Sequence, residues 1–148
     1  PRALGVYLKA GFVNGLEPAL ADRLVDGFDP HPDRRIGFFL QHCGGAINRV
    51  PADATAFPHR HVSHALGLTV GWPVARVGDP SRHIDDLRRY WATLEPFTDG
   101  FYANDVADQA DAQVHANYRQ NYPRLVAVKN RYDPANLFRL NANIVPTV

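Results

Sequence analysis

The chain has 148 residues, of which 45% are hydrophobic and 21% are charged, and this composition is typical of a globular domain rather than a disordered tail. The 16 basic residues are scattered and nearly balanced by 15 acidic ones, so the sequence predicts no nucleic-acid partner. No apolar run approaches the roughly 20 residues of a membrane-spanning helix, and the first residues, Pro1-Arg2-Ala3-Leu4, lack the basic, apolar and small-residue pattern of a secretory signal. We therefore expect a cytoplasmic protein without a membrane partner.

Two residue counts bear on what kind of chain this is. It contains no methionine, which is unusual for a complete translation product, so we expect a fragment or a processed piece of a longer protein. The single Cys43 excludes an intrachain disulfide and leaves the redox compartment open.

The first hundred residues mix strand and helix patterns. Asn14-Gly15 predicts a turn, and leucines at helical spacing predict a helix over 16–28. The clearest helix begins at Asp79-Pro80, which supplies a cap and a first-turn proline, and it ends at Glu95-Pro96. Strands are predicted over residues 4–12, 35–40, 46–50 and 62–72.

The last third is mainly helical. Residues 101–104 form a short strand or a loop, and a helix begins near Asp108, is interrupted near Asn121-Tyr122-Pro123 and stops at Asp133-Pro134. The strands lie too close together for regular βαβ units. The sequence therefore predicts an α+β fold, with an antiparallel sheet and helices on one face.

An ordered series of residues fills this last third. It comprises Tyr102-x-Asn104, then Tyr118, Asn121 and Tyr122, then Arg124-Leu125-x-x-x-Lys129-x-x-Tyr132-Asp133-Pro134-x-Asn136-x-Phe138, and finally Asn141-x-Asn143-Ile144-x-Pro146. The series resembles the C-terminal signature of the berberine-bridge-enzyme-like oxidases of the vanillyl-alcohol-oxidase superfamily. Upstream, Gly44-Gly45-Ala46-Ile47 and Ala54-Thr55-Ala56-Phe57-Pro58-His59-Arg60 are similar to the family's substrate-domain strands.

The resemblance implies a flavoenzyme. It makes residues 1–100 a portion of a substrate-binding domain and residues 101–148 the C-terminal segment, in one compact unit. The cofactor is FAD, held mostly by an N-terminal domain that this chain lacks, and we find no glycine-rich dinucleotide fingerprint within these residues. The implied reaction is transfer of a hydride from a small-molecule substrate to the flavin, with the isolated chain inactive.

Tyr102 and Asn104 are the main site candidates. On a strand, alternate residues share a face, so the two side chains would lie together. The resemblance places this motif near the flavin ring and the substrate. We therefore interpret Tyr102 as the catalytic base and Asn104 as a cofactor-binding residue, against the alternative of a tyrosine that only packs in a core or an interface.

Asn141 and Asn143 are further candidates for cofactor binding, since the similar family segment runs beside the flavin. Their alternative role is to satisfy backbone groups in a terminal turn. We interpret a second set of residues as docking and folding residues rather than chemical ones: Arg124, Lys129, Tyr132, Asp133 and Asn136.

Two further patterns limit the site. His59, His61 and His64 lie within six residues, but no cysteine or acidic residue nearby completes a ligand set, so we expect no metal. Plant family members carry a catalytic acid shortly before a tryptophan, whereas the corresponding run here, 66–72, contains no carboxylate. Its glycines would leave room for a bulky substrate, and the base would be Tyr102 or lie outside the chain.

A second function remains open. The chain could be a flavin-free α+β binding or dimerisation module of the same ancestry. In either case a substrate domain without its FAD partner would expose an apolar face, and such a face favours self-association, so a homodimer is a further expectation.

Overall fold

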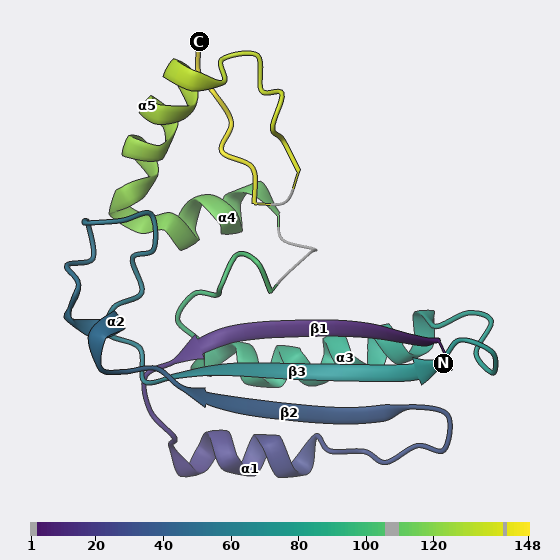
Figure 1. Ribbon diagram of the computed structural model, residues 1–148. Helices are drawn as coiled ribbons and strands as arrows, with labels where there is room; N and C mark the ends of the chain where they lie inside the picture. The colour runs from purple at the N-terminus through teal and green to yellow at the C-terminus, as the bar shows by residue number, and fades with distance from the viewer. Residues whose placement is uncertain (1–2, 106–109, 141) are drawn as a thin grey trace.

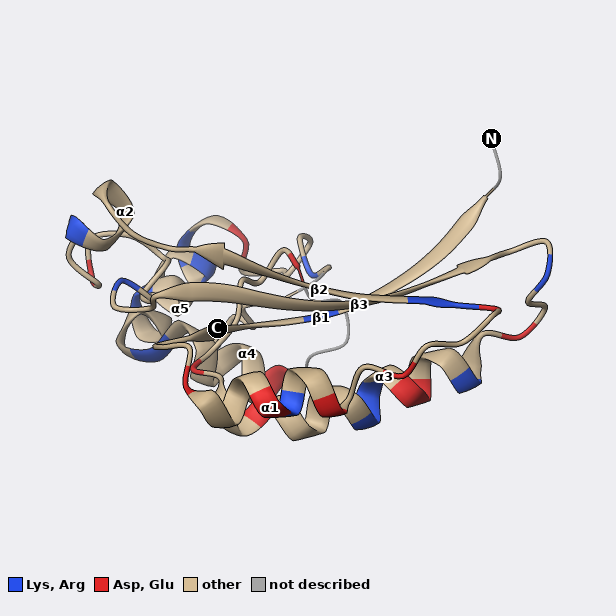
Figure 2. Ribbon diagram, turned by 90° about the horizontal axis from the view of Figure 1, so that it is seen from below, with Lys and Arg blue, Asp and Glu red and all other residues tan. Residues whose placement is uncertain are grey.

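A three-stranded antiparallel sheet forms the base of the computed structural model, which describes residues 3–105, 110–140 and 142–148. Strand β3 (His64–Pro73) lies in the centre, between β1 (Leu4–Val13) and β2 (Arg35–His42). Helices α1 (Pro18–Asp26) and α3 (Ser81–Leu94) lie on the same side of this sheet (Figure 2). The predicted α+β fold, an antiparallel sheet with helices on one face, is confirmed.

The core lies between the sheet and these two helices. Alternate residues of β3 point toward the helices, because successive side chains of a strand point to opposite faces. The helices present apolar residues at three- and four-residue spacing to meet them. The buried side chains of this cluster include Leu66, Leu68, Val70 and Trp72 of the strand, Leu20 and Leu24 of α1, and Leu87, Trp91 and Leu94 of α3.

The opposite face of the sheet is bare of helices among the described residues (Figure 2). The apolar alternation that predicts β1 lies on this face, where Leu4 and Val6 stand opposite Pro73 and Gly71 of β3. Leu4 and Val6 are 60% and 63% exposed, whereas Phe12 at the other end of the strand is 4% exposed. The most apolar side of β1 is thus directed away from the helices.

One predicted strand is wrong. Residues 46–50 form no strand; Ala46–Arg49 is instead a four-residue helix, α2. Gly45 has φ +66°, a conformation that diverts the chain from the direction of β2. The Asn48 side-chain amide then donates to the Val62 carbonyl at 3.1 Å, which holds the helix against the approach to β3.

The C-terminal helices stand beyond the edge strand β1, on the side away from β3 (Figure 1). They are α4 (Asp111–Tyr118), the 3₁₀ turn η2 (Arg119–Asn121) and α5 (Tyr122–Tyr132), and a second 3₁₀ turn, η1 (Glu95–Phe97), ends α3. The predicted interruption of the helix is confirmed: Arg119 has φ +50°, and Pro123 lies in the first turn of α5. The predicted stop at Asp133 is also confirmed.

Hydrogen bonds join these helices to the loop between α2 and β3. The buried Asn121 donates from Nδ2 to the carbonyls of Ala52 and Thr55, at 2.7 and 2.9 Å, and Arg124 donates to the Asp53 carbonyl at 3.3 Å. The division of the chain into a substrate-binding portion, residues 1–100, and a C-terminal segment, residues 101–148, stays a prediction. No helix in the described part of the chain is long and apolar enough to cross a membrane.

Candidate active site

Tyr102 lies in the wall of a cavity of about 530 Å³, a size typical of small-molecule sites. One row of the sheet forms part of this wall, because Phe12 and Gln41 both stand opposite Ala65 in the strand register. These three residues point to the helix-free face. The remaining lining residues are Cys43, Ile47, Asn48, Phe57, His59, Arg60, Val62, Tyr102 and Asp105. The cavity therefore opens on the side of the sheet that the helices leave uncovered.

Tyr102 and Asn104 lie together, although not for the expected reason. Residues 103–105 form a turn rather than a strand, closed by a hydrogen bond of 3.0 Å from the Asp105 amide to the Tyr102 carbonyl. The turn brings Asn104 Nδ2 to within 2.9 Å of the Tyr102 hydroxyl, to which it donates. The Tyr102 ring packs edge-on against Phe57, with centroids 6.4 Å apart. The Tyr102 phenolic oxygen is thus an acceptor in this arrangement.

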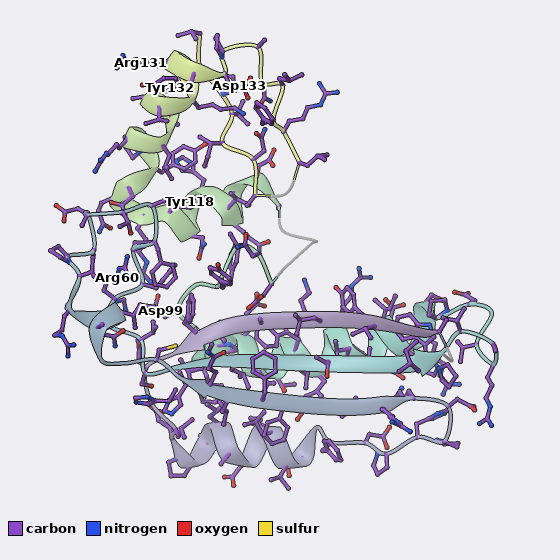
Figure 3. All side chains as sticks on the ribbon, in the orientation of Figure 1. Arg60, Asp99, Tyr118, Arg131, Tyr132 and Asp133 are labelled. Carbon is purple, nitrogen blue, oxygen red and sulfur yellow. The ribbon has the colours of Figure 1, made fainter. Side chains whose placement is uncertain are left out.

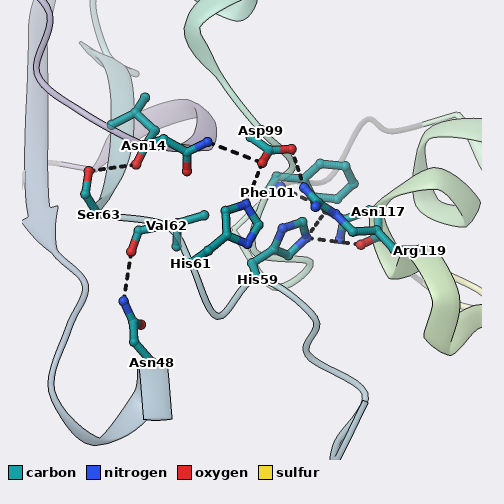
Figure 4. A network of polar contacts seen from close by, with 11 residues as sticks. Asn14, Asn48, His59, His61, Val62, Ser63, Asp99, Phe101, Asn117 and Arg119 are labelled. Atoms are coloured by element: carbon teal, nitrogen blue, oxygen red, sulfur yellow. Dashed lines mark hydrogen bonds and ion pairs between the residues drawn. The ribbon is translucent and has the colours of Figure 1, made fainter. Parts of the chain in front are cut away.

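The segment that leads to Tyr102 is fixed by backbone and side-chain hydrogen bonds (Figure 4). The Phe12 amide donates to the Gly100 carbonyl at 2.8 Å, and the Asp99 amide donates to the Phe12 carbonyl at 2.7 Å. From α4, Asn117 Oδ1 accepts a hydrogen bond of 2.9 Å from the Phe101 amide. The residue just before Tyr102 is therefore tied to the C-terminal part of the chain.

His59 is a second side chain that contacts Asn117. Its side chain is 1% exposed, and its Nε2 lies 2.9 Å from Asn117 Oδ1 and 3.0 Å from the Asn117 carbonyl oxygen. Because both neighbours are acceptors, Nε2 must carry the proton, and Nδ1 is left as a buried acceptor that has no partner in the described structure. Burial, together with the positive charge of Arg119, lowers the pKa of His59, although the hydrogen bonds to Asn117 oppose this.

Asp99 gathers a second set of contacts beside His59 (Figure 4). Its carboxylate accepts hydrogen bonds from His61 Nε2 at 2.8 Å, from Asn14 at 3.5 Å and from the Arg119 guanidinium. Burial alone would raise the pKa of Asp99, but the His61 hydrogen bond and the charge of Arg119 outweigh burial and lower it. Asp99 therefore links β1, the loop before β3 and the end of α4.

The lowered pKa of His59 predicts a pH dependence of stability. The unfolded chain takes up the imidazole proton near the ordinary value of 6.5, whereas the folded chain resists it. Stability is therefore fully present above about pH 6.5 and is lost as the pH falls through the lower folded value. Burial also lowers the pKa of His83, which adds a loss of the same sign. We expect the free energy of unfolding, measured in urea, to decrease from about pH 7.5 to about pH 5. His59→Gln should flatten this slope, and an unchanged slope would contradict the assignment.

The two asparagines of the tail are not seen to join the site. Asn141 lies outside the described residues. The side-chain oxygen of Asn143 is buried and has no partner in the described chain, and none of the hydrogen bonds between described residues links it to Tyr102 or Asn104. The proposed flavin contacts of both residues stay predictions.

Three of the docking residues of the signature, Lys129, Asp133 and Asn136, lie around the end of α5. Asp133 lies at the end of α5, on the far side of that helix from the sheet (Figure 3). Its carboxylate accepts hydrogen bonds from Lys129 and from the amides of Leu137 and Phe138, and Lys129 also donates to the Phe138 carbonyl. Asn136 has φ +52°, as a tight turn requires. These contacts close the tail back onto α5.

The three clustered histidines have separate partners. His59 bonds to Asn117, His61 to Asp99, and His64 Nδ1 lies 3.0 Å from the Ser63 hydroxyl. Within the described residues, no group of three or more His, Cys, Asp or Glu side chains is arranged to hold a metal ion.

The structure also reveals two features that sequence reasoning missed. Asp105 is the carboxylate among the described lining residues of the Tyr102 cavity, and its place three residues after Tyr102 was the available signal. Room beside Gly67 is already filled, because a Cβ there would lie 2.1 Å from the Phe39 ring. At Gly71 a Cβ would meet only the Gly5 carbonyl, at 3.7 Å. Of these two glycines, only Gly71 leaves open space.

Comparison with known proteins relates the segment that carries Tyr102 to a family. Residues 101–145, which carry Tyr102, Asn104 and Asn117, match the family described as berberine and berberine like. The chain belongs to the berberine-bridge-enzyme-like family. It is 31% identical over 131 residues to berberine bridge enzyme-like 12 of Arabidopsis thaliana and 33% identical over 110 residues to the uncharacterized FAD-linked oxidoreductase YvdP of Bacillus subtilis. These matches cover 77% and 74% of this chain.

Solved structures agree on the fold. BBE-like #28 from Arabidopsis thaliana superposes with a TM-score of 0.81 at 19% identity, over 98% of this chain and 34% of that one. Berberine bridge enzyme from Eschscholzia californica gives 0.73 at 22% identity, over 97% of this chain and 33% of that one. The berberine-bridge-like chain spans only about a quarter of each of the two curated relatives, 24% in both cases.

Proposed function

We propose that this chain is the substrate-side, C-terminal part of an FAD-dependent oxidoreductase that transfers a hydride from a small molecule to flavin. The observation that carries the proposal is the Tyr102 cavity on the helix-free face of the sheet, to which Tyr102 and Asp105 of the matched segment contribute. A substrate roof needs such an open face, because the flavin ring and the substrate must lie against it. The names of the relatives as FAD-linked oxidoreductases support the same assignment.

The residues of the cavity fit a ring-sized molecule with polar edges. Three of its lining side chains have buried polar atoms without partners in the described structure: His59 Nδ1, Asn48 Oδ1 and Arg60 Nε. Phe12 and Phe57 supply apolar surface between them. We propose that Asn104, which donates to the Tyr102 hydroxyl, binds the cofactor, and that Asn143 and Asn141 also bind it.

The bound flavin would supply the oxidising power, and the side chains of this chain would orient the substrate and move its proton. We propose that Tyr102, as its phenolate, accepts the proton of a substrate O–H or N–H at its oxygen and becomes a neutral phenol, while the hydride leaves the adjacent carbon for the flavin. Asn104, which donates to that oxygen, would hold the ring in position. Phe57 and Phe12 would keep water from the reacting bond.

A flavin-free binding module is the second candidate, favoured by one observation: the exposed Leu4 and Val6 give β1 an apolar outer face that a second copy could cover. The absorbance spectrum of the full-length protein separates the two candidates. We expect a stoichiometric flavin in the full-length protein, and a colourless, inactive preparation of the 148-residue chain. Stoichiometric flavin in the 148-residue chain would contradict the proposal that FAD is held mostly by another domain. A full-length protein without flavin would contradict the oxidoreductase and support the flavin-free binding module.

A further inference from the structure

We propose that Asn117 and His59 are positioning residues of the active site, which hold the backbone of residues 100–101 so that Tyr102 faces the cavity. This inference rests on the proposed function, because it assigns the way in which the Tyr102 phenol is oriented. Neither residue is assigned a contact with the reacting groups. Both act through the position of Tyr102.

One oxygen atom is the centre of the arrangement. Asn117 Oδ1 accepts two hydrogen bonds of 2.9 Å, from the Phe101 amide and from His59 Nε2. An amide oxygen has two acceptor positions, so these donors use both. Asn117 and His59 are 6% and 1% exposed, so water cannot easily replace either bond.

The tautomer and the ring position of His59 are both fixed by its neighbours. Its Nε2 also faces the Asn117 carbonyl oxygen at 3.0 Å, which leaves only the Nε2-protonated tautomer able to satisfy both oxygens. The ring is held between Phe12 and Phe57, with centroids 5.1 and 5.6 Å away. The imidazole is therefore a fixed donor, and it orients the Asn117 amide so that the oxygen meets the Phe101 N–H.

A glycine at position 100 lets the backbone pass close to the His59 ring. Gly100 has φ +82°, and a Cβ there would lie 2.1 Å from His59 Cε1 and 2.9 Å from Asn117 Oδ1. The chain therefore passes directly over the histidine before it reaches Phe101 and Tyr102. Asn117 belongs to α4, and His59 belongs to the loop before β3. The segment that leads to Tyr102 is therefore held by contacts with both of these elements.

The test is a double-mutant cycle on flavin reduction in the FAD-loaded full-length protein. We expect N117A to slow reduction at saturating substrate by about 10- to 100-fold, as a misplaced catalytic group does, without changing the flavin content. If Asn117 acts through Tyr102, N117A should slow the Tyr102→Phe protein by less than about threefold. Equal slowing in both backgrounds would overturn the proposal. N117D retains both acceptor positions and should recover most of the rate, whereas an N117D protein as slow as N117A would also count against it.

A matched control separates positioning from general stability. Asn121 is also a buried asparagine with two hydrogen bonds, but it binds the carbonyls of Ala52 and Thr55 and not the Tyr102 segment. N121A should lower the unfolding temperature as N117A does and change the limiting rate of reduction by less than about threefold. An N121A protein as slow as N117A would show that the rate follows stability alone, and would overturn the proposal.

Amide hydrogen exchange gives a readout that does not depend on activity. In the full-length protein, N117A should speed exchange of the Phe101 amide about tenfold or more, and N121A should not, because only Asn117 accepts from that amide. Unchanged exchange at Phe101 in N117A would overturn the positioning role. A full-length protein that binds no flavin would instead contradict the proposed function and leave this exchange experiment intact.

Discussion

Replacing Tyr102 with phenylalanine should slow flavin reduction in the FAD-loaded full-length protein by about 10²- to 10⁴-fold, the usual contribution of a general base. The substitution removes only the phenolic oxygen, which receives the Asn104 hydrogen bond, from a side chain that lines the cavity. Flavin content and the packing against Phe57 should survive, because the ring stays. Stopped-flow measurement of the flavin absorbance at saturating substrate gives the rate directly.

The neighbouring asparagine provides the comparison. Asn104→Ala removes one hydrogen bond to the tyrosine and leaves the phenol in place, so we expect a smaller loss, of roughly 1–3 kcal/mol in the barrier. Reduction at full speed in Tyr102→Phe would remove Tyr102 as the base. Asp105 would then be the next residue to test, because its carboxylate lines the same cavity.

The sequence predicts most of the secondary structure, because the elements that pack on the core have strong local patterns. Helix α3 is found within two residues of its predicted start, since Asp79-Pro80 precedes an apolar face at helical spacing. The strand at 46–50 is wrong because short apolar segments fit both periods, and the decision is made by Gly45 and by the Asn48 hydrogen bond to a distant carbonyl.

The candidate site is only partly predictable. The spacing of Tyr102 and Asn104 finds two residues that do meet, although they meet through a turn. The contact between His59 and Asn117 joins residues 58 positions apart, and no local period encodes it. The same holds for the Phe39 ring that covers Gly67, since it depends on the register between β2 and β3. Long-range packing, rather than local preference, decides these positions.

Replacing Gly100 with alanine should destabilise the chain by roughly 2–6 kcal/mol. A non-glycine residue at φ +82° costs about 1–3 kcal/mol, and forcing a methyl group into a filled site costs about the same again. The added Cβ would lie 2.1 Å from the ring of His59, which is buried and held by Asn117, so the ring has little room to move. Urea unfolding followed by circular dichroism should show the loss as a lower midpoint.

Two other glycines separate the backbone cost from the packing cost. Gly45→Ala carries a positive φ of +66° but meets nothing within 4 Å, so it should cost only the backbone part, about 1–3 kcal/mol. Gly15→Ala has neither problem and should change stability by less than about 1 kcal/mol. Adding His59→Ala to Gly100→Ala removes the ring that the new methyl group strikes, so the double variant should lose less than the sum of the single losses. Strict additivity would show that the cost of Gly100→Ala lies in the backbone alone and that the histidine does not press on this segment.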